Sequence, residues 1–179
     1  MSEENASNSD FACYAFISIG ANLPSATATP AETIALAFDC ISRLSSSESL
    51  KSSLYSSSPV DSPAGTPDFL NALAGIIPDD TETPLSLLHK LQAIEDGAGR
   101  TRSGVINEAR TLDLDLIVFK AAVCHTPELI LPHPRTHERR FVLEPLIEIV
   151  GESFVLPGMN KSIGSFSNNI HDQQLIKNS

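Results

Sequence analysis

The chain has 179 residues, of which 41% are hydrophobic, so it is long enough and apolar enough to fold as one globular domain. A formal net charge of -10 argues against broad electrostatic binding to nucleic acid or to an anionic membrane. Apolar runs are shorter than the roughly 18 residues of a membrane span, and the N-terminus is acidic and polar, unlike a secretory signal. We therefore expect a cytoplasmic protein that acts as a monomer, with neither nucleic acid nor membrane as a partner.

The three cysteines are odd in number and far apart, and apolar residues flank each of them. They are Cys13, Cys40 and Cys124. This pattern is typical of reduced, buried thiols and argues against a disulfide framework or a cysteine-based zinc site.

Composition along the chain predicts one domain between two tails. Residues 1–10 are polar and lack hydrophobic periodicity, so we expect a disordered N-terminal tail there. The sequence turns polar again beyond Gly158, which predicts a loose C-terminal tail over residues 159–179. The domain itself is expected to span residues 11–158.

Hydrophobic periodicity predicts six main elements in chain order. They are a strand over 14–19, a helix with Thr29 as N-cap, a strand over 50–58, a strand over 69–78, a helix from Thr83 to Gly97, and a strand over 111–119. A short strand at 128–131 and a helix from near Arg140 follow. This order is the split pattern of a ferredoxin-like α+β sandwich, so we expect two or three layers, with helices on the faces of an antiparallel-rich sheet.

The strand over 111–119 carries two aspartates, Asp113 and Asp115. Side chains alternate along a strand, so both point to one face while the intervening leucines point to the other. Two carboxylates about 7 Å apart at their Cα atoms repel each other unless a cation or hydrogen bonds offset the charge. Mg²⁺ does this well, because it commonly takes one or two carboxylates together with water and phosphate oxygens. The alternative is an exposed edge strand that uses charge to block aggregation.

Positive charge is concentrated in one part of this acidic chain, since six of the seven arginines lie between positions 100 and 140. They are Arg100, Arg102, Arg110, Arg135, Arg139 and Arg140. The planar guanidinium group suits phosphate oxygens, so the cluster predicts binding of a compact, highly charged anion. An ordinary solvated basic face is the alternative.

One histidine in this interval, His133, stands between two prolines that restrict the backbone and the directions open to its imidazole. This placement suits stacking or phosphate contact, and a solvated surface histidine is the simpler alternative. The sequence has no P-loop or nucleophile-elbow motif, which argues against classical P-loop proteins and serine hydrolases.

Four spaced blocks occur in order along the chain. They are Phe69-Leu70-Asn71-Ala72; Ile94-Glu95 followed by Gly99-Arg100 and Arg102; Arg110-Thr111-Leu112-Asp113-Leu114-Asp115; and Leu131-Pro132-His133-Pro134-Arg135 with Arg139 and Phe141. Together they resemble the 6-hydroxymethyl-7,8-dihydropterin pyrophosphokinase family. The resemblance implies transfer of a pyrophosphoryl group from ATP to the hydroxymethyl oxygen of the pterin, with release of AMP, in folate biosynthesis.

The resemblance also implies roles for individual residues. Asp113 and Asp115 would hold two Mg²⁺ ions bound with ATP, and Arg100 and Arg110 would act as catalytic residues that contact the phosphate groups. The positions that match the ATP site are Gln92, Glu95, Arg102, His133 and Arg139. The positions that match the pterin pocket are Phe69, Asn71 and Phe141.

Two segments depart from the family pattern. Ile106, Asn107 and Glu108 stand where the family commonly has a basic residue, an aromatic residue and Gly-Pro, and the segment 57–60 lacks the usual Thr-Pro stretch. The first departure keeps open a second hypothesis, a relative that binds nucleotide or pterin without normal turnover. A third reading, a ferredoxin-like structural or interaction domain, would require the aspartate pair and the arginine cluster to be coincidental.

Overall fold

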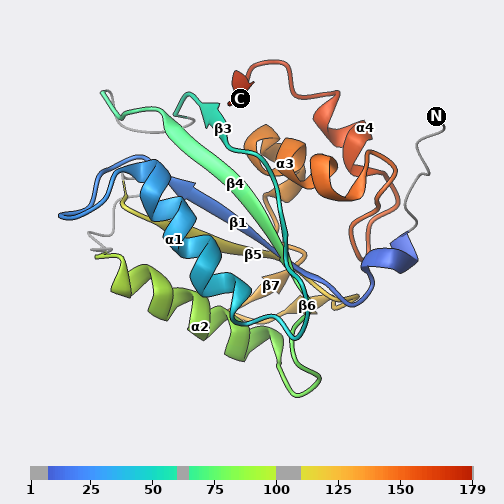
Figure 1. Cartoon of the computed structure of the whole chain (residues 1–179). Helices are drawn as coiled ribbons and strands as arrows, with labels where there is room; N and C mark the ends of the chain where they lie inside the picture. The colour runs from blue at the N-terminus through green and yellow to red at the C-terminus, as the bar shows by residue number, and fades with distance from the viewer. Residues whose placement is uncertain (1–7, 60–64, 100–109, 179) are drawn as a thin grey trace.

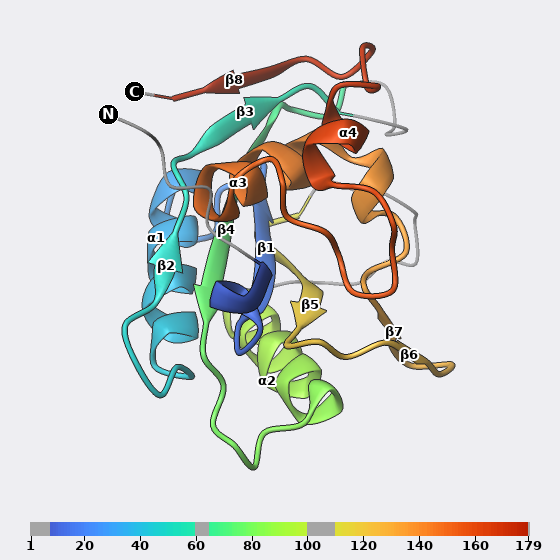
Figure 2. The ribbon, with the colours of Figure 1, turned by 90° about the vertical axis from the view of Figure 1, so that its right-hand side faces the viewer.

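A computed structural model describes residues 8–59, 65–99 and 110–178 of the chain. It forms three layers, with one sheet between two pairs of helices (Figures 1 and 2). The helices are α1 (Pro30–Ser42) and α2 (Pro84–Gly97) on one face, and α3 (Arg140–Val150) and α4 (Ile163–Ser167) on the other. Two short 3-10 helices are η1 (Asn8–Phe11) and η2 (Thr136–Glu138).

The main sheet is antiparallel in every pairing, with strand order β5-β1-β4-β3-β8 and with β2 also paired to β4. Its strands are β1 (Ala15–Ala21), β2 (Leu50–Lys51), β3 (Tyr55–Ser57), β4 (Phe69–Ile76), β5 (Asp113–Phe119) and β8 (Leu175–Lys177). A separate two-stranded sheet joins β6 (Cys124–His125) and β7 (Ile130–Leu131). The predicted α+β sandwich with an antiparallel-rich sheet is confirmed, and it has three layers.

Both long N-terminal helices begin where the sequence predicts. Thr29 and Thr83 are the N-caps of α1 and α2, each followed by a proline in the first turn and each part of a capping box. Their hydroxyl oxygens accept hydrogen bonds from backbone N–H groups that the helix itself leaves without partners. Local sequence therefore determines these two starts.

Side-chain alternation along the strands divides the interior into two cores. Ile17, Ile19 and Leu114 point toward α1 and α2, where they pack with Leu87 and Leu91 of α2. Phe16, Leu73 and Ile117 belong to the second core, beneath α3 and α4. The strand residues of β5 that carry charge thus lie on the α3 side of the sheet, opposite its leucines.

The single strand expected over 50–58 is divided into β2 and β3. Between them, the Ser52 hydroxyl accepts a hydrogen bond from the backbone N–H of Leu73, and the Ser52 N–H donates to the Leu73 carbonyl. A side chain thus replaces part of the strand ladder, which interrupts the regular pairing.

The expectation of a loose tail over 159–179 is corrected by the structure. Ile163 of α4 is buried in the second core, and β8 pairs with β3 at the edge of the main sheet. The apolar residues that anchor this segment are isolated among polar ones, so they form no run that periodicity could detect. At the other end, η1 places Asn8–Phe11 in a short helix, and residues 1–7 lie outside the described ranges.

The three thiols are free, as expected, but the expectation that they are buried is wrong. Cys13 and Cys40 are exposed and Cys124 is half-buried. Cys13 precedes β1, and Cys40 lies on α1 at an open groove between α1 and α2, where its side chain stays accessible to water. Within the described ranges, no helix is both long and apolar enough to cross a membrane.

The Glu148 carboxylate of α3 forms hydrogen bonds and an ion pair with residues at the edge of the sheet. Glu148 accepts hydrogen bonds from the Ser53 hydroxyl (2.7 Å), the Ser53 N–H (3.1 Å) and the Tyr55 hydroxyl (2.9 Å), and it pairs with the Lys177 ammonium (3.0 Å). Burial acts to raise the pKa of Glu148, but these hydrogen bonds together outweigh it and lower the pKa below its ordinary value. The ionised carboxylate therefore joins α3 to both β3 and β8.

We predict that the stabilisation from Glu148 is lost in acid. Because its pKa is lower in the folded than in the unfolded chain, its contribution is complete above the unfolded pKa and disappears as the pH falls through the folded one. Glu148→Gln should therefore be less stable than wild type at pH 7, and the difference should shrink below about pH 4. Urea unfolding at several pH values measures this. The exposed Glu48→Gln should stay within about 0.5 kcal/mol of wild type at neutral pH, and a Glu148 difference that does not change with pH would contradict the assignment.

Candidate active site

Charged and polar side chains from three neighbouring strands meet on the α3 side of the sheet. Asp113 of β5 and Asn71 of β4 each pair with Gly20 of β1, which lies between them. A Cβ atom built on Gly20 would lie 3.8 Å from Asn71 Oδ1 and 3.9 Å from Asp113 Cβ. Asp115 lies two residues further along β5, opposite Ser18. The aspartates share one face, as their spacing predicts, and the amide of Asn71 shares it with them.

Each aspartate is paired with an arginine. Arg110 Nη1 lies 2.8 Å from Asp113 Oδ1, and Arg139 Nη1 lies 3.1 Å from Asp115 Oδ2. The aspartate side chains are 25% and 31% exposed and the arginines 16% and 17%, so all four groups are partly withdrawn from water. Two carboxylates and two guanidinium groups at one place can bind both a cation and a phosphate group.

The electrostatic environment shows that the aspartates repel each other. Burial and the neighbouring Asp113 raise the pKa of Asp115, while His133, Arg139 and Arg110 act in the opposite direction. Burial is also the main reason that the pKa of His133 is lowered. The arginines therefore offset the carboxylate repulsion only in part.

The donor set fits a hard divalent cation. No group of three or more His, Cys, Asp or Glu side chains suited to a metal occurs in the parts of the chain that the structure describes. A cation at Asp113 and Asp115 would thus need further oxygen ligands from water or from a bound phosphate. This is the coordination that Mg²⁺ commonly adopts with nucleotides, and its charge would offset both the burial and the Asp113 repulsion that raise the pKa of Asp115.

Two residues of α2 were predicted to contact ATP. Glu95 is 2% exposed, and its Oε1 accepts a hydrogen bond of 2.7 Å from the backbone N–H of Leu114, between the two aspartates. Gln92 lies three residues earlier, half-buried on the side of the helix that it shares with Glu95. In the structure Glu95 thus holds the β5 backbone in place, and its predicted contact with ATP stays a prediction.

The segment after β7 brings a histidine against β5. The Leu131–Pro132 peptide bond is cis, and the backbone N–H of His133 donates to the Ile117 carbonyl at 2.9 Å. The buried Thr136 hydroxyl in turn donates to the His133 carbonyl at 2.8 Å. These bonds place His133 where it influences the protonation of Asp115.

The residues predicted to bind a pterin lie along the same face. Asn71 is 3% exposed, and Phe69 lies two residues earlier at the start of β4. Phe141 stands in the first turn of α3, with the Arg139 guanidinium carbon 5.7 Å from its ring centre. The fold thus brings Phe141 next to an arginine that contacts Asp115.

The sequence profile of the 7,8-dihydro-6-hydroxymethylpterin-pyrophosphokinase (HPPK) family matches residues 16–151 of the chain. The chain belongs to this family. A 2-amino-4-hydroxy-6-hydroxymethyldihydropteridine pyrophosphokinase of Haemophilus influenzae is 38% identical over 165 residues, which are 91% of this chain and 96% of that protein. The enzyme of the same name from Pseudomonas aeruginosa is 38% identical over 135 residues, 75% of this chain and 78% of that one.

Solved structures of family members share the fold. The bifunctional HPPK-DHPS of Plasmodium falciparum superposes with a TM-score of 0.62 over 87% of this chain at 14% identity. The chain spans less than half of that bifunctional protein, 44% of its length. The similarity supports the three-layer arrangement of the HPPK part.

Several predicted positions lie outside the described residues. They are Arg100, Arg102 and the departing residues Ile106, Asn107 and Glu108. Sequence reasoning assigned no role to Asn22, whose Oδ1 accepts the Arg110 N–H at 2.8 Å and whose Nδ2 donates to the Pro67 carbonyl at 3.1 Å. The sequence offered one signal for this role, because Asn22 is a polar residue that directly follows a buried strand ending in Gly20-Ala21.

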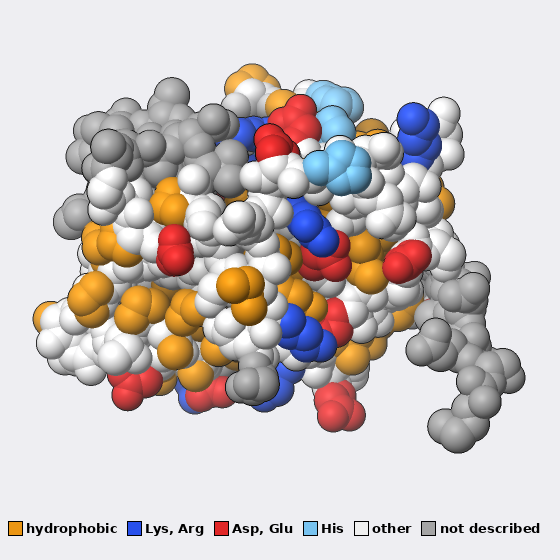
Figure 3. Space-filling model, turned by 90° about the horizontal axis from the view of Figure 1, so that it is seen from above, with side chains coloured by type: hydrophobic (Ala, Val, Ile, Leu, Met, Phe, Trp, Pro, Cys, Tyr) orange, Lys and Arg blue, Asp and Glu red, His pale blue; other side chains and the backbone are white. Residues whose placement is uncertain are grey.

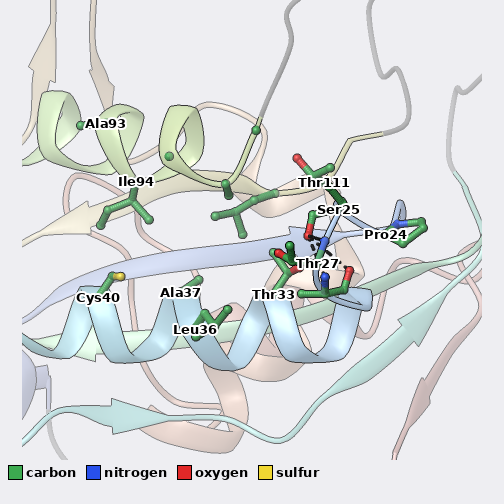
Figure 4. A pocket seen from close by; sticks show the side chains of 16 residues that line it. Pro24, Ser25, Thr27, Thr33, Leu36, Ala37, Cys40, Ala93, Ile94 and Thr111 are labelled. Atoms are coloured by element: carbon green, nitrogen blue, oxygen red, sulfur yellow. Dashed lines mark hydrogen bonds between the residues drawn. The ribbon is translucent and has the colours of Figure 1, made fainter.

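The face of the molecule seen in Figure 3 is mixed in character, with acidic, basic and histidine side chains among hydrophobic ones. A groove of about 790 Å³ runs between α1 and α2, on the side of the sheet opposite the aspartate pair (Figure 4). The described residues that line it, such as Leu36, Ala37 and Ile94, include no charged side chain. This groove is separate from the aspartate pair.

We predict that Asn22→Ala destabilises the protein. Asn22 is 5% exposed, and the change would leave the N–H of Arg110 and the carbonyl of Pro67 without these partners. The free energy of unfolding should fall by about 1–3 kcal/mol in urea unfolding. The exposed Asn168→Ala is the matched control, expected within about 0.5 kcal/mol of wild type. A loss no larger than that of the control would show that Asn22 does not fix the approach to β5.

Proposed function

We propose that this protein transfers the pyrophosphoryl group of ATP to 6-hydroxymethyl-7,8-dihydropterin, with release of AMP, in folate biosynthesis. The observation that carries the proposal is the pair Asp113 and Asp115, each held by an arginine on the same sheet face as Asn71. Relatives of nearly the same length as this chain bear the name of that enzyme. A hydroxymethyl oxygen would bond to the β-phosphorus as the bond from that phosphorus to the oxygen of AMP breaks.

Mg²⁺ is the cation that fits the proposed reaction. When bound with ATP at Asp113 and Asp115, two such ions would offset the charge of the triphosphate. Arg110 and Arg139 lie beside these carboxylates and would contact phosphate oxygens through guanidinium groups that carry several donors. The chain contributes position and charge in this reaction, which suits phosphoryl-type transfer because that chemistry depends mainly on positioning and electrostatic stabilisation.

The acceptor would lie on the β4 side of the aspartates. Asn71 offers an amide to the polar edge of a flat heterocycle, and Phe69 and Phe141 offer rings to its faces. Because Asn71 and Asp113 flank the same glycine, a ligand bound to the amide would lie next to the carboxylates.

The decisive assay measures AMP. Incubation with Mg²⁺, ATP and the hydroxymethyl pterin should release one AMP per pterin pyrophosphate formed, as followed by chromatography. Omission of the pterin or addition of a chelator should stop the reaction. Formation of ADP would exclude pyrophosphoryl transfer, and calorimetric binding of ATP without AMP release would favour the non-catalytic relative that Ile106, Asn107 and Glu108 suggest.

We predict that Asp113→Asn and Asp115→Asn each reduce kcat/KM by about 100-fold or more. Each change removes one negative charge from the proposed cation site and leaves an arginine without its ionic partner. Calorimetric titration should likewise show that both variants bind MgATP more weakly than wild type. Asp39→Asn, on the exposed side of α1, is the control and should match wild type. Full activity in either the Asp113 or the Asp115 variant would contradict the proposed cation site.

We also predict that Asn71→Ala selectively affects the acceptor. The KM for the pterin should rise by about 10-fold or more, because the variant lacks the amide proposed to bind the heterocycle edge. The KM for ATP should stay within about twofold of wild type. Equal changes in both constants would indicate a general loss of structure.

The expected monomeric state and cytoplasmic location stay predictions. Light scattering after size-exclusion chromatography, at the protein concentration of the AMP assay, tests the first.

A further inference from the structure

The amide of Asn71 has a defined orientation. Its Nδ2 donates to the Ser57 hydroxyl at 2.9 Å, and the carbonyls of Tyr55 and Phe69 lie at 3.4 Å and 3.5 Å from the same nitrogen. Only the bond to Ser57 has an ordinary length, since the other two are at the upper limit for a hydrogen bond. Ser57 is therefore the principal partner of the amide nitrogen.

The amide oxygen of Asn71 faces the site. Oδ1 lies 3.8 Å from the position of a Cβ on Gly20, on the side of Asp113. No described residue donates a hydrogen bond to this oxygen. A reversed amide would place Oδ1 against two backbone carbonyls, and the repulsion between these oxygens disfavours that orientation. The described residues thus use the amide nitrogen of Asn71 as a donor and leave its oxygen as an acceptor for a ligand.

Ser57 is itself fixed by the sheet. It is 6% exposed and lies in β3 between two strands, paired with Phe69 of β4 and with Leu175 of β8. Its neighbour Ser56 points to the other side of the strand, where its hydroxyl donates to Asn178 Oδ1 at 3.1 Å. The two serines occupy the same strand and differ in whether they contact Asn71.

We propose that Ser57 is a positioning residue for the acceptor substrate: its hydroxyl holds Asn71 so that Oδ1 accepts a hydrogen bond from an N–H group on the edge of a flat heterocycle. This inference rests on the proposed function, because it takes Asn71 as the amide that binds the pterin. It adds that the site selects a ligand with a donor at this edge and that β3, which β4 and β1 separate from the aspartates of β5, controls affinity for the acceptor alone.

The first experiment measures kinetic constants for the pterin and for ATP separately. Ser57→Ala should raise the KM for the pterin about three- to tenfold, because this is the usual effect of losing one hydrogen bond. The value of kcat and the KM for ATP should stay unchanged. Ser57→Thr keeps the hydroxyl and should restore the wild-type KM. Ser56→Ala is the matched control and should leave every constant unchanged.

The second experiment observes the amide directly and needs no activity. In ¹⁵N-labelled protein, the Asn71 side-chain NH₂ signals should move in Ser57→Ala and exchange faster with solvent, and Ser56→Ala should leave them in place. If Ser57→Ala does not fold, Ser57→Val and Ser57→Thr replace it as a pair of similar shape that differs in the hydroxyl.

The outcomes separate the two proposals. Moved Asn71 signals together with a higher pterin KM support the positioning role. An unchanged pterin KM in an active enzyme, or unchanged Asn71 signals, overturns it and leaves the proposed function intact. Absence of pterin-dependent AMP release from the wild-type protein overturns the proposed function, and calorimetric titration with the pterin then decides whether Ser57 affects binding.

Discussion

The repulsion between Asp113 and Asp115 is the constraint on which the site depends. Their strand holds them on one face, and burial together with the charge of Asp113 raises the pKa of Asp115. Arg110 and Arg139 act against this rise as ionic partners, while Glu95 fixes the backbone of Leu114 from the other side of the sheet. Two carboxylates held this close despite their electrostatic repulsion are suited to bind a divalent cation that is also coordinated by a phosphate group.

The sheet order brings the remaining groups to this pair. Because β1 lies between β4 and β5, Gly20 separates Asn71 from Asp113 by one strand, and its lack of a side chain leaves room above the sheet. The segment after β7 supplies His133, and the start of α3 supplies Arg139 and Phe141. The residues proposed to bind phosphate and those proposed to bind the heterocycle thus meet along one sheet face. Family membership and this geometry point to the same reaction.

The edge strands β3 and β8 also contact residues of the candidate site and of α3. Strand β3 carries Ser57, which contacts Asn71, and Tyr55, which contacts Glu148 of α3. Strand β8 covers the outer side of β3, and Lys177 completes the set of groups around Glu148. The C-terminal segment therefore folds onto the domain through the β8–β3 pairing and the burial of Ile163, and it covers the strand that carries Ser57.

Local signals in the sequence determined where α1 and α2 begin, because helix caps depend on neighbours in the chain. They also determined that the two aspartates of β5 share one face, because side chains alternate along a strand. The ordered blocks were sufficient to indicate the family. Only the tertiary structure decided which arginine pairs with which aspartate, that Asn22 anchors Arg110 and that Ser57 holds Asn71. It also decided that residues after 158 fold onto the sheet. Arg110 and Asp113 are three residues apart, but the other contacts join residues 14 to 122 positions apart. Their energies therefore depend on strand order and side-chain direction, which no local pattern records.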